Sequence, residues 1–67
     1  MDFNTFVTKE ANSAKGADLL VMVNREWDGT SAQVTVFDHE GSYICDKFIS
    51  SSELDALKSD MPLAAFV

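Results

Sequence analysis

Between residues 18 and 49 the chain repeats the alternation of apolar and polar side chains that is typical of β-strands, and short turn sequences interrupt it twice. Asp28-Gly29 is the sequence of a tight hairpin turn, and Asp38-His39-Glu40-Gly41 places a glycine where a second turn needs a positive φ. Strands joined by such short turns pair antiparallel. The sequence therefore predicts a three-stranded antiparallel β-meander with strands at residues 18–27, 32–37 and 43–49.

A helix is expected on each side of this meander. Within residues 3–14 the apolar side chains are spaced so that they share one helical stripe, which consists of Phe3, Phe6, Val7, Ala11 and Ala14. Asp2 or Asn4 is the expected N-cap, and Gly16 marks the expected end.

The second helix is short and follows the third strand. Ser50 with Glu53, or Ser52 with Asp55, has the pattern of a capping box, and Pro62 stops the helix. Its inner stripe is expected to hold Leu54, Leu57 and Met61.

The chain of 67 residues has no linker, repeat or low-complexity stretch, so we expect one α+β domain over residues 1–67. A domain this small buries only about 60% of the surface of its unfolded chain. Two short helices can cover one face of a three-stranded sheet but not both. We therefore expect a single layer of helices on one face, in the order helix, three strands, helix.

The register of the two hairpins follows from burial. With Asp28-Gly29 as the first loop, valines of the first two strands lie opposite one another on one face of the sheet, which we call the valine face. The expected pairs are Val21 with Val36, Val23 with Val34 and, on the other face, Leu20 with Phe37. Placing His39-Glu40 at the second tip adds Tyr43 and Cys45 to the valine face. A shift by one residue would bury the Asp46 carboxylate, at a cost of several kcal/mol.

The helices should cover the valine face and leave the other face, which we call the open face, in contact with water. Its centre would be apolar and its rim polar and mostly acidic, which is the composition of a protein interface. The residues expected to bind a partner lie on this face or in the turns beside it: Leu20, Met22, Glu26, Phe37, Asp38, Glu40, Ile44, Asp46 and Phe48.

Eleven acidic and five basic residues give the chain a net charge of −6. This charge repels the phosphates of nucleic acids, so direct binding to DNA or RNA is not expected. An acidic surface attracts basic clefts of other proteins, although acidity also simply keeps small proteins in solution.

Cys45 is the single cysteine, so no disulfide can form within a monomer, and this fits a reducing compartment. The longest apolar run before the tail, Leu19 to Val23, is far shorter than the roughly 20 residues of a membrane span. The first residues also lack the basic and apolar regions of a signal peptide. These features predict a cytoplasmic protein that does not insert into a membrane.

No reactive side chain stands in a pattern that defines a catalytic or metal site. His39 lies between two acids, but no second His or Cys stands at metal-ligand spacing. Cys45 falls on the valine face and has no basic neighbour to activate it. Helix capping explains the serines at 50–52, and the three glycines are singletons at the ends of elements. We expect no enzymatic activity, no cofactor and no metal.

Two apolar features have more than one interpretation. Trp27 either anchors an interface or seals one end of the core. The apolar tail, residues 63–67, completes the core, folds back over the open face, or is a terminal peptide for a carboxylate-binding pocket. We favour the core for the tail, because each buried apolar side chain contributes about 1.5–3 kcal/mol.

The order helix, three strands, helix is similar to that of the double-stranded RNA-binding domain over nearly the whole chain. The second helix of that family opens with a lysine-rich motif that grips phosphates, whereas this chain has Ser50-Ser51-Ser52-Glu53-Leu54-Asp55 at that place. The resemblance therefore implies a similar fold and does not imply RNA binding.

The sequence predicts a small, acidic, non-enzymatic protein-binding module. Our preferred hypothesis is an inhibitor or regulator that occludes a basic or nucleic-acid-handling surface of a partner, as phage accessory and anti-defence proteins do; a DNA mimic is one form of it. The alternative is a homodimeric structural or regulatory subunit in which the open face pairs with itself.

Overall fold

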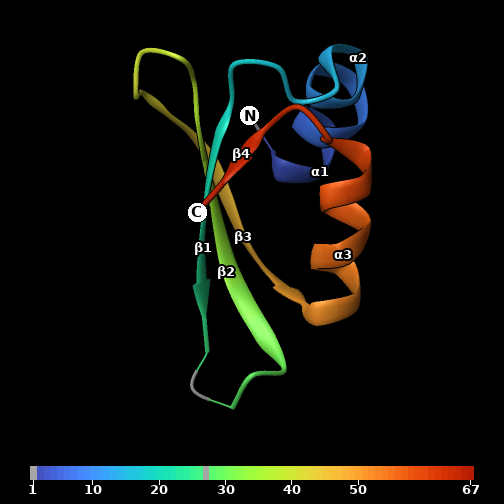
Figure 1. The fold of residues 1–67 in the computed structure, drawn as a ribbon, viewed down its shortest axis with the longest axis vertical. Coiled ribbons are helices and arrows are strands. Elements are labelled where there is room, and N and C mark those ends of the chain that lie inside the picture. Colours follow the sequence, from blue (N-terminus) through green and yellow to red (C-terminus); the bar gives the residue numbers. More distant parts are fainter. Residues whose placement is uncertain (1, 27) are drawn as a thin grey trace.

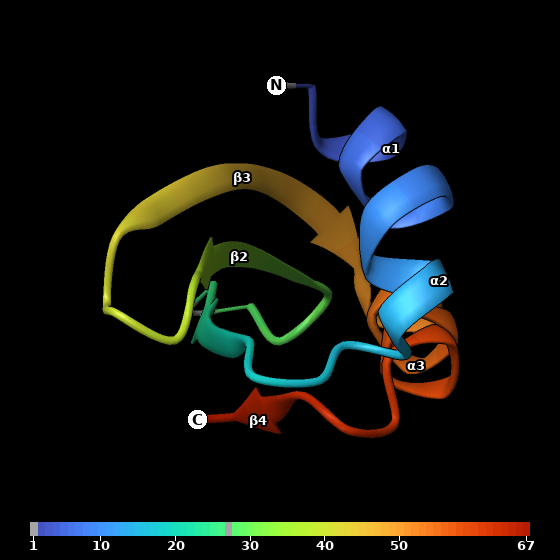
Figure 2. The same ribbon diagram turned by 90° about the horizontal axis from the view of Figure 1, so that it is seen from above.

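The alternating segments form the strands of a β-meander in the computed structural model, which describes residues 2–26 and 28–67. The strands are β1 (Leu20–Arg25), β2 (Ser31–Phe37) and β3 (Tyr43–Ser50), and each pairs antiparallel with the next. The helices lie together on one side of this sheet (Figures 1 and 2). The predicted α+β class, with its helix, antiparallel sheet and second helix, is confirmed.

The apolar tail adds a strand that the sequence analysis did not predict. Strand β4 (Ala65–Phe66) pairs parallel with β1, so that the four-stranded sheet has the order β3-β2-β1-β4. Phe66 and Ala64 pack against the buried core, whereas Leu63 and Val67 are exposed, so the favoured core role holds for part of the tail only. The tail therefore lies along the edge of β1 and does not fold over the open face.

The register of the first hairpin is as predicted. Val21 lies opposite Val36, Val23 opposite Val34, and Leu20 opposite Phe37. The valine face is the buried face, and it forms the core together with apolar side chains of the helices. The fully or nearly fully buried residues are Phe3, Phe6, Ala11, Val21, Ala32, Val34, Val36, Cys45, Ile49, Leu54, Leu57 and Met61.

The second hairpin is paired two residues away from the predicted register. A tip at His39-Glu40 would place Tyr43 opposite Val36, whereas Cys45 lies opposite Val36. A shift of two residues keeps side chains on their predicted faces, but β3 also carries one extra residue between Cys45 and Tyr43, because Tyr43 lies opposite Phe37. An extra residue of this kind is a β-bulge, which breaks the alternation of side chains between the two faces. The predicted faces of Tyr43 and Ile44 were therefore wrong. Tyr43 lies beside Phe37 on the open face, and Ile44 packs against the core.

The N-terminal helical segment begins as predicted and continues with wider turns than expected. It consists of α1 (Phe3–Thr5), the π-helix η1 (Phe6–Ala11) and α2 (Asn12–Ala14). The Asp2 carboxylate caps it by accepting a hydrogen bond of 3.2 Å from the Thr5 N–H. A π-turn aligns residues five apart, and both Phe6 and Ala11 are thereby buried. Ala14, expected on the same stripe, is exposed.

The second helix, α3 (Ser51–Asp60), uses the first of the two capping boxes considered. The Ser50 hydroxyl accepts a hydrogen bond from the Glu53 N–H and donates one to the Glu53 carboxylate, each 3.2 Å long. The predicted inner stripe is buried, with Met61 immediately after the last turn. Together, the cap at one end and the stripe along one side fix α3 against the sheet.

The tail is tied to the end of the N-terminal helical segment as well as to β1. The Leu63 N–H donates to the Lys15 carbonyl over 2.9 Å, and Lys15 and Gly16 have φ values of 54° and 78°. No helix within residues 2–26 and 28–67 is long and apolar enough to cross a membrane. The interpretations of Trp27 concern a residue outside the described ranges.

Candidate functional site

The open face presents side chains in rows that run across the meander. The strand register places Leu20, Phe37 and Tyr43 in one row, Met22, Thr35 and Asp46 in the next, and Asn24, Gln33 and Phe48 in the third. Ala65 lies beside Leu20 at the β4 edge. Of the predicted partner-binding residues, the sheet brings together Leu20, Met22, Phe37, Asp46 and Phe48 on this face.

Large apolar side chains of the open face are in contact with water. Met22 is 49% exposed, Phe48 is 60% exposed and Tyr43 is 59% exposed. The Tyr43 ring packs edge-on against Phe37, with 6.4 Å between the ring centroids. Several such side chains on one sheet face form an apolar surface that a partner can cover. The first and third rows carry the aromatic rings.

Asp46 is the single carboxylate in these three rows, and two neighbours on the same face hold it in place. Tyr43 donates its phenolic hydrogen to one carboxylate oxygen, and the Gln33 amide donates to the other over 3.3 Å. An ionised carboxylate has about four acceptor sites, so both oxygens retain acceptor capacity. The open face therefore combines exposed apolar rings with one oriented negative charge.

The hydrogen bond between Tyr43 and Asp46 raises the pKa of the Tyr43 phenol above its ordinary value, because the nearby carboxylate holds the phenolic hydrogen. Asp46→Asn is expected to lower this pKa toward about 10, since the amide carries no charge. Tyr43 is the single tyrosine, so an ultraviolet titration of phenolate absorbance measures this group alone. Asp55→Asn, the same change on an exposed residue of α3, is the control. An equal shift in both variants, or no shift in Asp46→Asn, would contradict the contact.

The predicted acidic residues of the second turn lie beside the open face. Asp38 is half-buried, and its carboxylate accepts hydrogen bonds from the N–H groups of Glu40 (2.9 Å) and Ser42 (2.8 Å). Its first role is thus to shape the turn. Glu40 is exposed, with one carboxylate oxygen 3.7 Å from His39 Nε2.

Two further predicted residues do not belong to the exposed surface of this face. Glu26 directly follows β1 and is half-buried, and its main chain closes the first loop through hydrogen bonds with Ser31 and Gly29. Ile44 packs against the core and leaves the site. Tyr43, which sequence reasoning assigned to the valine face, takes a place on the open face instead.

Cys45 lies on the valine face and is 3% exposed, and burial raises the pKa of its thiol. Within residues 2–26 and 28–67, no three His, Cys, Asp or Glu side chains lie close enough together to hold a metal ion.

The chain matched nothing in comparisons with models of known protein families, with curated proteins and with solved structures.

Proposed function

We propose that this protein is a non-enzymatic binding module whose open face docks on another protein. The observation that carries the proposal is the exposure of Met22, Tyr43 and Phe48 on a sheet face where Asp46 is held by hydrogen bonds. Aromatic residues and methionine are enriched at the centres of protein interfaces. A face already fixed by strand pairing also loses little conformational freedom on binding.

The apolar rows supply the attraction in this mechanism. Moving a side chain such as that of Phe48 out of water contributes about 1.5–3 kcal/mol when it is fully covered. Met22 in the second row and Phe37 in the first row belong to the same surface. A partner with a complementary apolar surface therefore gains from covering several side chains at once.

The charge of the molecule selects the kind of partner. A net charge of −6 speeds encounter with a basic surface, and the oriented Asp46 carboxylate fits a partner's arginine or lysine. We infer an inhibitor or regulator that occludes a basic, nucleic-acid-handling surface, in the manner of phage accessory proteins. An apolar docking face fits this better than a DNA mimic, since the three described rows hold one carboxylate. The single, buried Cys45 supports a reducing, cytoplasmic setting.

The test compares two variants that bring the same charge to different surfaces. Phe48→Asp is expected to abolish capture of the partner from a lysate of the source organism, because it replaces an exposed aromatic ring of the open face by a charge. Leu63→Asp is the matched control, because Leu63 lies in the tail and is 62% exposed, against 60% for Phe48. Mass spectrometry identifies the captured protein, and circular dichroism verifies the fold of both variants.

A partner retained by the wild type and by Leu63→Asp, but lost with Phe48→Asp, supports the proposal. Equal capture by all three forms would refute the role of the open face. If Phe48→Asp itself unfolds, Met22→Asp places the charge in the neighbouring row.

The alternative function is a homodimer in which two open faces cover each other. The exposed apolar rows favour it equally well, although two chains of charge −6 repel one another. Light scattering over a range of protein and salt concentrations distinguishes the two. A dimer that Phe48→Asp converts to a monomer assigns the face to self-association, whereas a monomeric wild type leaves it to a foreign partner.

A further inference from the structure

A hollow of about 400 Å³ lies away from the open face, between the sheet and α3. It is lined by Val23 and Arg25 of β1, Lys58 of α3, and Phe66 and Val67 of the tail. This volume is within the range of about 300–1,000 Å³ that small-molecule sites occupy. The Val23 N–H donates to the main-chain oxygen of Val67, just after β4, over 2.8 Å, so hydrogen bonding holds the tail against β1 in one wall.

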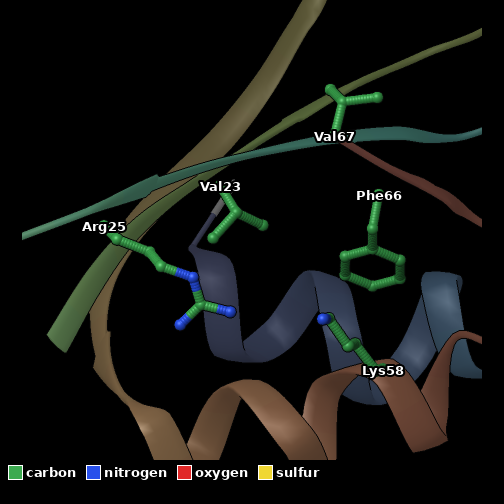
Figure 3. A pocket seen from close by; sticks show the side chains of 5 residues that line it. All are labelled: Val23, Arg25, Lys58, Phe66 and Val67. Carbon is green, nitrogen blue, oxygen red and sulfur yellow. The ribbon is translucent and has the colours of Figure 1, made fainter. Parts of the chain in front are cut away.

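Two cations are directed into this hollow. Figure 3 shows the Arg25 guanidinium and the Lys58 ammonium pointing into the same space from the sheet and from the helix. Neither lies within 4.0 Å of a carboxylate in the part of the chain that the structure describes. The chain has five basic residues and a net charge of −6, so this convergence runs against the charge of the molecule as a whole.

The fold by itself explains only one of these cations. Lys58 lies in the last turn of α3, where a positive charge complements the helix dipole, and its ammonium lies 5.8 Å from the centre of the Phe66 ring. Among residues 2–26 and 28–67, no ion pair or cation–π contact involves Arg25. Two like charges that face the same space repel each other, and an anion between them converts that repulsion into attraction.

The apolar wall of the hollow indicates which chemical group the ligand carries besides its anionic group. Phe66 is half-buried with its ring directed into the space, and Val23 continues the apolar surface beside it (Figure 3). An apolar wall next to two cations suits a molecule that joins an anionic group to an aromatic or branched apolar group. Arginine in particular holds carboxylates and phosphates through two parallel hydrogen bonds.

We propose that this hollow binds a small organic anion, a carboxylate or phosphate monoester attached to an apolar group. Arg25 and Lys58 hold the anionic group, and Phe66 and Val23 contact the apolar part. The site is independent of the open face, so its occupation and the docking of a partner can be measured separately.

The test is a nuclear magnetic resonance titration of the whole chain with benzoate and with phenyl phosphate, and with benzyl alcohol as the neutral control. Saturable shifts at the amides of Val23, Arg25 and Phe66 are expected for the anions. Arg25→Gln and Lys58→Gln should each weaken binding at least about fivefold, because each removes one of two cations. Lys58→Arg, which keeps the charge, should retain binding.

Lys9→Gln is the matched control, since Lys9 is an exposed cation of η1 and does not line the hollow. It should leave the affinity unchanged, and circular dichroism verifies the fold of each variant. The proposal is overturned if the anions cause no saturable shifts, if benzyl alcohol binds as tightly as benzoate, or if neither glutamine variant weakens binding more than Lys9→Gln does. Tighter binding of benzoate would indicate that the ligand carries a carboxylate, and tighter binding of phenyl phosphate that it carries a phosphate monoester.

Discussion

Gly16→Ala is expected to leave a large fraction of the molecules unfolded at room temperature. Gly16 has a φ of +78°, and a Cβ placed there lies 2.7 Å from the Met61 Cβ and 2.9 Å from the Ala64 Cβ. The positive φ costs an L-residue about 1–2 kcal/mol, and overpacking typically adds about 1–3 kcal/mol. Domains of this size have a stability of only roughly 3–5 kcal/mol, so the sum consumes most of it.

Gly41→Ala is the control that separates these two causes. Gly41 has a φ of +84°, yet no atom lies within 4 Å of a Cβ placed there. Only the conformational cost of about 1–2 kcal/mol remains, so this variant should stay folded. Urea denaturation followed by circular dichroism measures both free energies of unfolding. Equal losses in the two variants would mean that the close approach to Met61 and Ala64 does not exist in solution.

Leu54→Ala is expected to have a similarly large effect through a different mechanism. Leu54 is 1% exposed at the centre of the contact between α3 and the valine face. Removing a buried leucine side chain typically costs about 2–5 kcal/mol, because apolar contacts are lost and a cavity remains. The variant should therefore be marginally folded at best.

Leu63→Ala makes the same change at a residue that is 62% exposed. Surface substitutions of this kind usually alter stability by about 0.5 kcal/mol or less. Both variants are compared by urea denaturation, in the presence of a stabilising osmolyte if Leu54→Ala does not fold without one. A loss in Leu54→Ala no larger than that in Leu63→Ala would contradict the position of α3 on the sheet.

The elements that sequence reasoning predicted correctly are those in which a local pattern and burial agree. The valines of the first hairpin fit one register only, because a shift by one residue would turn them toward water. Helix α3 carries its own start signal in Ser50 and its stop signal in Pro62. In both cases the residues that specify the hairpin register or the helix bounds lie close together in the sequence.

The open face was predicted less completely, because a single inserted residue decides which side chains reach it. The bulge near Phe37 exchanges Tyr43 for Ile44, and periodicity alone cannot locate such a break. A signal was nevertheless present. Hairpin loops longer than two residues, with a glycine at their end as at Gly41, commonly include a bulge.

The tail could not be assigned from sequence, because its apolar composition fits several environments. Its pairing with β1 joins Leu20 to Ala65 and Val21 to Phe66, residues far apart in the chain. No local signal specifies a parallel partner at such a distance. The hollow beside it was missed for the same reason, since Arg25 and Lys58 meet only after β1, α3 and the tail have come together.

The parallel pairing of β4 with β1 also bears on the order in which the sheet can be completed during folding. Strands β1, β2 and β3 follow one another in the chain and are joined by short loops, so the meander can form from contacts between neighbouring segments. Strand β1 then has one hydrogen-bonded neighbour, and its other edge is paired only when Ala65 and Phe66, far away in the chain, come to lie beside it. The contact of Gly16 with Met61 and Ala64 depends on the same late segment. A molecule in which β4 has not yet paired therefore exposes an unpaired edge of β1, a strand that lies inside the completed sheet.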